Sequence, residues 1–296
     1  MTDPSGSRHT APHPTPRAGG HPAPRSARFA EVSNTSDRKT HVVKASQAGA
    51  SRISPWFLVA VLLYAPVVLF IDGRLSAPWP WEYVLGAVTL GLLWLWTTRL
   101  SPGDRLQVWL CVLVATFFEF LGSQVWGAYR YRFVSIPAFV PFGHGLVYVF
   151  AFGVAALPWV CRHERLFTLS VLGLAAAWAL GGVGPLAALT GRVDVHGLLW
   201  LSIFAAVIVL SPRRALFAGI FLAVTDLELA GTLFGAWTWL PVTPWAHVAS
   251  GNPPSAIAGG YTVIDGSVLI LVALLARVRR VKTYAAASTA NSTSPT

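Results

Sequence analysis

Eight long apolar segments constrain this chain more than any other feature of its sequence. Each is roughly 17–25 residues long, the length that an α-helix needs to cross the hydrocarbon core of a bilayer, and the sixth is the shortest. The predicted spans are Ile53–Ile71, Trp81–Thr98, Leu106–Gly127, Phe139–Val160, Leu166–Leu189, Val195–Leu210, Ala215–Leu240 and Ser255–Ala276. The pattern predicts an all-α fold, a polytopic membrane bundle of about eight transmembrane helices.

The composition supports a membrane protein and excludes several other classes. The chain is 54% hydrophobic and only 11% charged, whereas a soluble domain carries roughly 25% charged residues. Its formal net charge of +10 is therefore attributed to the N-terminal region and to loops, and no nucleic-acid partner is expected. The two cysteines, Cys111 and Cys161, lie inside apolar segments, so neither a disulfide scaffold nor a cysteine-based metal site is expected.

Charge also predicts the domain organisation and the orientation. Residues 1–52 are rich in Pro, Ser, His and Arg and lack an apolar period, which predicts a disordered basic cytoplasmic tail. Residues 53–281 form the transmembrane domain, and residues 282–296 are predicted to be a second disordered tail. Most basic residues lie in the N-terminal tail and after even-numbered spans. The opposite side has only Arg74, Arg130, Arg132 and Arg192. The positive-inside rule then predicts a multi-pass plasma-membrane protein with both termini in the cytoplasm.

One motif occurs twice, about 108 residues apart. Both copies read Glu-x-x-Gly-Ser/Thr, followed by Gly-Ala-aromatic-x-aromatic. The copies run from Glu119 to Tyr131 and from Glu228 to Trp239. The two copies are four predicted spans apart, and because four is an even number both halves have the same orientation in the membrane. The repeat predicts a parallel duplication of residues 53–165 and 166–281.

The intramembrane acids are the candidate catalytic groups. Each should cost on the order of 3 kcal/mol at the membrane centre, so each is expected to face a protein interior or a wet cavity. Glu119 and Glu228 head the two motif copies, and Asp226 lies two residues before Glu228. These three are the predicted catalytic residues, with the hydroxyl one turn after each glutamate expected to bind its carboxyl. The alternative is structural hydrogen bonding between helices.

Aromatic and polar residues near the acids form the predicted substrate-binding site. Aromatic faces stabilise cations, so an acid beside an aromatic wall suits protonation of an isolated carbon–carbon double bond. The alternative for the aromatic residues is the belt of Trp and Tyr at a membrane interface. The predicted substrate-binding residues are Trp126, Tyr129, Tyr131, His144, Trp237, Trp239, Asn252 and Asp265.

Several motifs of other chemistry are absent from the sequence. It contains no phosphate-binding glycine-rich loop with Lys-Ser/Thr, no His-Glu-x-x-His and no Asp-rich magnesium motif. No cofactor and no metal are therefore expected. The expected partners are membrane lipids and a lipid-soluble substrate, which the resemblance described next implies is a polyene or isoprenoid, and the oligomeric state is left open.

These residues also resemble a known family. Glu119-x-x-Gly122 with Gly127-x-Tyr129-x-Tyr131, and Asp226-x-Glu228 with Trp237-x-Trp239 and Asn252, are similar to motifs of the carotenoid biosynthesis membrane proteins that include bisanhydrobacterioruberin hydratase. The resemblance covers roughly residues 105–265. It implies a polytopic enzyme that adds water to a terminal double bond of a long isoprenoid. It also implies that Glu119 is the acid and that Asp226 or Glu228 is its partner.

The sequence departs from that family in three places, and it leaves three functions open. The usual Pro-Phe-Gly is Val-Trp-Gly at Val125–Gly127, and Gly-His-Gly at 143–145 and Gly-Asn-Pro-Pro-Ser at 251–255 are additional. We expect an acid-initiated hydratase or cyclase of a polyene. The alternatives are a proton-coupled transporter or lipid flippase, and a non-catalytic membrane scaffold.

Overall fold

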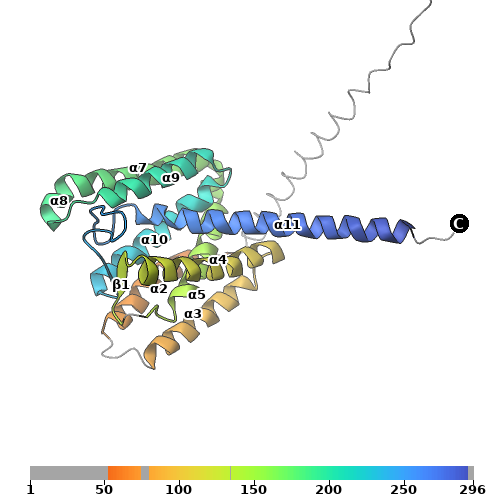
Figure 1. Ribbon diagram of the computed structural model, residues 1–296, viewed down its shortest axis with the longest axis horizontal. Coiled ribbons are helices and arrows are strands. Elements are labelled where there is room, and N and C mark those ends of the chain that lie inside the picture. The colour runs from red at the N-terminus through yellow and green to blue at the C-terminus, as the bar shows by residue number, and fades with distance from the viewer. Residues whose placement is uncertain (1–52, 75–79, 134, 293–296) are drawn as a thin grey trace, which may run out of the picture. The chain divides into compact units, whose positions relative to one another are not determined.

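The computed structural model describes residues 53–74, 80–133 and 135–292, all of which belong to one compact unit of the chain. The tail predicted for residues 1–52 lies outside the described residues. Ten α-helices are described (Figure 1): α2 Pro55–Arg74, α3 Trp81–Thr97, α4 Pro102–Phe120, α5 Val140–Ala155, α6 Pro158–Arg162, α7 Glu164–Val183, α8 Pro185–Thr190, α9 Val195–Leu210, α10 Arg214–Phe234 and α11 Tyr261–Ser292.

Five helical segments are long and apolar enough to cross a membrane. They are Pro55–Arg74, Pro102–Val125, Glu164–Val183, Arg214–Phe234 and Ile257–Val278. The prediction of a mainly helical chain with apolar helices of membrane length is therefore confirmed. Each of the eight predicted spans contains a helix, but α3, α5 and α9 have only 17, 16 and 16 residues. At about 1.5 Å per residue, 16 residues rise about 24 Å, less than a core of about 30 Å.

Two predicted spans are interrupted where a proline follows. The span predicted as Phe139–Val160 is two helices, because Leu157 is extended before Pro158 and ends the helical path between α5 and α6. A residue before proline is pushed away from the helical region by the proline ring. The span predicted as Leu166–Leu189 is likewise divided between α7 and α8, at Gly184 before Pro185.

The prediction of an all-α fold is wrong in one respect, because the two aromatic-x-aromatic strings are β-strands. β1 (Tyr129–Tyr131) pairs antiparallel with β2 (Trp237–Trp239), with Tyr129 opposite Trp239. Gly127 and Gly235 precede them at φ +62° and +75°, a left-handed conformation that glycine adopts without steric cost. Each glycine ends its helical segment, so the predicted continuation of a helix to Leu240 is also wrong.

Helix α5 lies at the centre of the packing. Its residues from His144 to Val154 are all buried, and it contacts α2, α3, α4 and α10. A helix that is apolar on every side must be buried on every side. Figure 1 shows α7 and α9 side by side, and each of these two helices also contacts α10. The central position of α5 brings His144, in its second turn, into the interior.

Helix α11 extends farther than the sequence indicates. The last predicted span ends at Ala276, and residues 282–296 are predicted to be a disordered tail. The structure continues the helix to Ser292. The run Ala285–Ala287 lies in this extension, and alanine has the highest intrinsic helix propensity.

Candidate functional site

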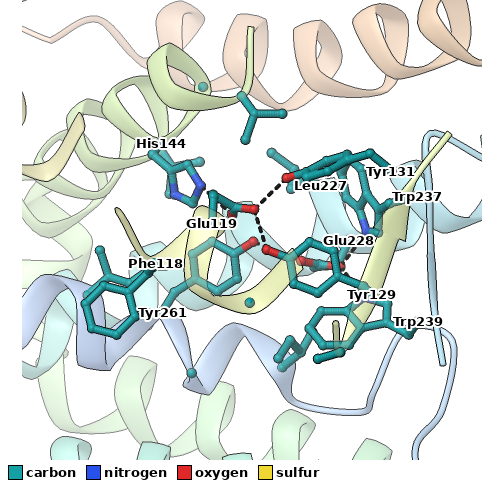
Figure 2. Close-up of a pocket in the computed structure, with 18 of the residues that line it drawn as sticks. Phe118, Glu119, Tyr129, Tyr131, His144, Leu227, Glu228, Trp237, Trp239 and Tyr261 are labelled. Atoms are coloured by element: carbon teal, nitrogen blue, oxygen red, sulfur yellow. Dashed lines mark hydrogen bonds and ion pairs between the residues drawn. The ribbon is translucent and has the colours of Figure 1, made fainter. Parts of the chain in front are cut away.

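A cavity of about 440 Å³ lies where the two copies of the repeated motif meet. Its wall is mainly apolar and comes from α2, α4, α5, α9, α10, α11 and both strands. Glu119 and Glu228 both line it, with 6% and 2% of their surfaces exposed. Figure 2 shows the two glutamates in the same part of the cavity, with the aromatic side chains of β1 and β2 around them. The structure thus brings the two motif copies together at one cavity.

Three side chains contact the carboxyl group of Glu119. The hydroxyls of Tyr129 and Tyr131 each donate to Oε2 at 2.5 Å. His144 Nε2 lies 2.9 Å from Oε1. Bonds of 2.5–2.7 Å are typical of a hydroxyl that donates to an ionised oxygen. Glu119 is thus held by two phenols on one oxygen and by an imidazole on the other.

Three side chains also contact Glu228, but with different chemistry. The indole nitrogens of Trp237 and Trp239 donate to Oε2 at 2.9 and 3.1 Å. The hydroxyl of Tyr261 donates to Oε1 at 2.9 Å. An indole N–H can donate and cannot accept. The Oε2 atom of Glu228 therefore faces two groups that can never accept a proton from it.

The glycine and hydroxyl residues of the motif have structural tasks. Ser123 and Thr232 donate to the backbone carbonyls of Glu119 and Glu228 at 2.7 and 2.8 Å. The expectation that these hydroxyls bind the carboxyls is wrong, because a hydroxyl one turn along a helix reaches the carbonyl of residue i−4. Gly122 leaves room for the Tyr129 ring, since a Cβ there would lie 2.9 Å from Tyr129 Cε1.

Aromatic contacts join the two copies across the sheet. Ring centroids are 4.6 Å apart for Tyr129 and Trp239 and 6.0 Å apart for Tyr131 and Trp237. The His144 ring stacks on Tyr261 at 5.2 Å with an interplanar angle of 23°. Each copy's donors are thus packed against the other copy's donors. Displacing one carboxyl's partners would disturb those of the other.

The two tyrosines of β1 are strongly perturbed. Burial, followed by the nearby charge of Glu119, raises the pKa of Tyr129 and of Tyr131 well above its usual value. Both effects disfavour the tyrosinate. Each phenol therefore keeps its proton and remains a hydrogen-bond donor over the physiological pH range.

The other predicted site residues are divided between the cavity and its surroundings. Trp126 lines the cavity. Asn252 does not, and its Oδ1 accepts from the backbone N–H of Trp239 at 2.9 Å, which fixes the end of β2. Asp226 and Asp265 are also outside the lining. Within the described residues, Asp226 Oδ2 has no hydrogen-bond partner. The predicted catalytic role of Asp226 thus gains no support from its position.

Sequence reasoning missed two residues that the site depends on. Tyr261 completes the donors of Glu228, and only its place after Gly259 and Gly260 at a helix start could have drawn attention to it. Asp194 accepts from the backbone N–H groups of Gly197 at 3.0 Å, Gly251 at 2.9 Å, and Ser255. The bonds to Gly251 and Ser255 fix the C-terminal end of the segment 241–256, part of which covers the cavity.

Comparisons of the chain with protein-family models, with curated proteins and with solved structures found no match. Among the residues that the structure describes, no group of three or more His, Cys, Asp or Glu side chains is placed to hold a metal ion.

Proposed function

We propose that this protein is an integral membrane enzyme that protonates a polyene of isoprenoid type and then hydrates or cyclises it. The observation that carries the proposal is the pair of buried carboxyls with unlike partners in one apolar cavity. A volume of about 440 Å³ falls within the roughly 300–1,000 Å³ of typical ligand sites. It accommodates the reacting end of a long isoprenoid.

The Glu119–His144 pair is the proposed acid. Its Oε1–Nε2 contact of 2.9 Å joins two groups that can each hold or release a proton. The double bond takes that proton, a C–H bond forms, and the adjacent carbon becomes a cation. In hydration, water adds to the cation and then loses a proton. In cyclisation, a second double bond adds, and a C–H proton leaves.

Glu228 is the proposed partner of the cation. Its Oε2 receives two indole N–H bonds, which hold the carboxyl in place without competing for a proton. An oriented negative charge and the faces of Trp237 and Trp239 would stabilise positive charge that develops on the substrate. The proton that leaves the substrate passes to this carboxyl and then to solvent, so a turnover consumes no net proton.

The substrate is proposed to enter from the side of the membrane. Four large hydrophobic residues of the cavity wall are also exposed at the protein surface, namely Trp126, Leu199, Trp245 and Val263. Exposed apolar side chains at the mouth of an apolar cavity suit a ligand dissolved in lipid. The proposed enzyme has eight membrane spans, a parallel internal duplication and both termini in the cytoplasm.

Conversion of an acyclic carotene by the purified protein in lipid nanodiscs tests the proposal. Glu119→Gln should lower the rate at least about 100-fold, the smaller end of general acid catalysis. The matched control is Glu164→Gln, because Glu164 is a partly exposed glutamate at the start of α7. Products are measured by mass spectrometry. Full conversion by a folded Glu119→Gln protein would rule out this mechanism.

A proton-coupled carrier is the second candidate. The observation in its favour is that two buried carboxyls share one cavity that reaches the surface, and intramembrane acids commonly mark proton-coupled pathways. Uptake of a lipid or amphiphile by proteoliposomes, driven by a pH gradient and lost in Glu228→Gln, would support it. Carotene conversion without a pH gradient would support the enzyme.

A further inference from the structure

A row of polar side chains follows one face of α4 below the cavity. Asp104, Gln107, Cys111 and Glu119 are three, four and eight residues apart, which places them on the same side of a helix with 3.6 residues per turn. All four are buried. From Asp104 to Glu119 the row covers about 22 Å at about 1.5 Å per residue. The proposed mechanism uses only its last member.

The middle of the row contacts two neighbouring helices. Cys111 Sγ lies 3.9 Å from the backbone carbonyl of His144 on α5 and 3.9 Å from Asp265 Oδ1 on α11. His144 is itself the partner of Glu119. Cys111 therefore contacts the backbone of His144 and a second buried carboxyl, that of Asp265, while the buried Ala115 separates it from Glu119 along α4.

Two buried polar atoms near Cys111 lack protein partners. Asp265 is 3% exposed and Tyr148, one turn after His144 on α5, is 1% exposed. Over the described ranges, neither Asp265 Oδ2 nor the Tyr148 hydroxyl has a hydrogen-bond partner. An unsatisfied buried polar group costs about 1–3 kcal/mol. Buried water molecules commonly satisfy such groups.

The row reaches the surface at the start of α4. Gln107 Oε1 accepts from Arg213 Nη1 at 2.9 Å, and Asp104 Oδ2 accepts from the Ser101 hydroxyl at 2.7 Å. Ser101 and Arg213 are both partly exposed.

We propose that these side chains, with water bound at Asp265 and Tyr148 and between Cys111 and the acid pair, form a proton route from the start of α4 to the Glu119–His144 pair. The inference rests on the proposed function in one respect. The acid gives up a proton in every turnover, and an apolar cavity filled by substrate offers no donor to replace it. The proton that enters along the route balances the one that leaves from Glu228.

Cys111 provides a direct test, because the chain has only two cysteines and the other, Cys161, is exposed. In a Cys161→Ala protein in nanodiscs, Cys111 gives the only S–H stretching band in the infrared spectrum. After transfer to D₂O, a proton route predicts that this band disappears within minutes. A band that persists for hours would overturn the proposal.

Three variants in the Cys161→Ala background locate the route. Asp265→Asn, Tyr148→Phe and Gln107→Leu should each slow the exchange about tenfold or more, since each ~1.4 kcal/mol added to a barrier is a factor of ten in rate. Asp226→Asn removes a carboxyl on α10 outside the row and should leave the rate unchanged. Unchanged exchange in Asp265→Asn and Tyr148→Phe overturns the route. Unchanged exchange in Gln107→Leu alone overturns entry from the start of α4.

The exchange experiment needs no substrate, so its outcome is separate from that of the proposed function. Fast, Asp265-dependent exchange in a protein that does not convert carotene would leave the route standing and remove the enzyme. If conversion requires Glu119 but the S–H group of Cys111 takes hours to exchange, the enzyme proposal would stand and the proton route would be ruled out.

Discussion

Gly231 is the position at which a small substitution should most disturb the site. A Cβ atom added there would collide with three atoms of the Trp237 ring. Trp237 is 5% exposed and its indole donates to Glu228, so the ring cannot move aside without losing that bond. We therefore expect Gly231→Ala to push the indole away from the carboxyl.

The size of the effect follows from three contributions. Losing a hydrogen bond to a charged group costs about 1.5–3 kcal/mol, and overpacking a buried site costs about 1–3 kcal/mol. Replacing glycine by alanine within a helix returns about 1 kcal/mol. The free energy of unfolding should thus fall by about 1.5–5 kcal/mol.

Unfolding of the purified proteins in mixed micelles, followed by tryptophan fluorescence, measures this difference. Gly266→Ala is the matched control, because Gly266 lies in α11 and a Cβ there meets nothing within 4 Å. Its free energy of unfolding should be equal to or slightly higher than that of the native protein. Equal stabilities for Gly231→Ala and Gly266→Ala would show that Trp237 is not held against Glu228, and the reasoning would fail.

Further predictions concern the two tyrosines of β1 and the segment 241–256 over the cavity. Since the pKa values of Tyr129 and Tyr131 are raised, the folded state keeps protons that the unfolded state loses above a pH of about 10. Stability should therefore fall as pH rises beyond that value, and fall less in Tyr131→Phe, as measured by unfolding at several alkaline pH values. Separately, Asp194→Ala leaves three buried N–H groups without their acceptor and should cost about 3 kcal/mol or more. Asp194→Asn should not restore the lost stability, because its amide N–H₂ group would face the N–H donor of Ser255. Equal free energies of unfolding for both variants and the native protein would contradict this role of Asp194.

The local sequence pattern predicted the helices and pointed to the candidate acids, because long apolar runs and isolated carboxyls can be recognised without knowing the tertiary structure. It did not predict the strands. Three residues such as Tyr129–Tyr131 are too short for periodicity to separate a helix from a strand. The strand exists because its partner, Trp237–Trp239, is brought beside it by the packing of α4 and α10 against α5. Gly127 and Gly235 were the local sign that each helix ends.

Tyr261 was missed for a similar reason. Its hydroxyl meets Glu228 only because the segment 241–256 carries the chain back over the cavity, and that segment is held by Asp194 from a different part of the chain. A contact that depends on two such long-range connections has no signature in local sequence. The sequence suggested a role only for the faces of the aromatic side chains, whereas in the structure their hydroxyl and indole N–H groups donate hydrogen bonds to the acids.

The unlike partners of the two carboxyls argue for unlike roles. If the carboxyls did the same work, there would be no physical reason for one to be held by phenols and an imidazole and the other by two indoles and a phenol. Imidazole at Glu119 can exchange a proton, whereas the indoles at Glu228 Oε2 can only donate hydrogen bonds. The polar row along α4 leads to Cys111, which touches the backbone of His144. The difference between an exchangeable imidazole at one carboxyl and non-exchangeable indoles at the other is the physical reason for assigning the acid role to the Glu119–His144 pair in the proposed mechanism.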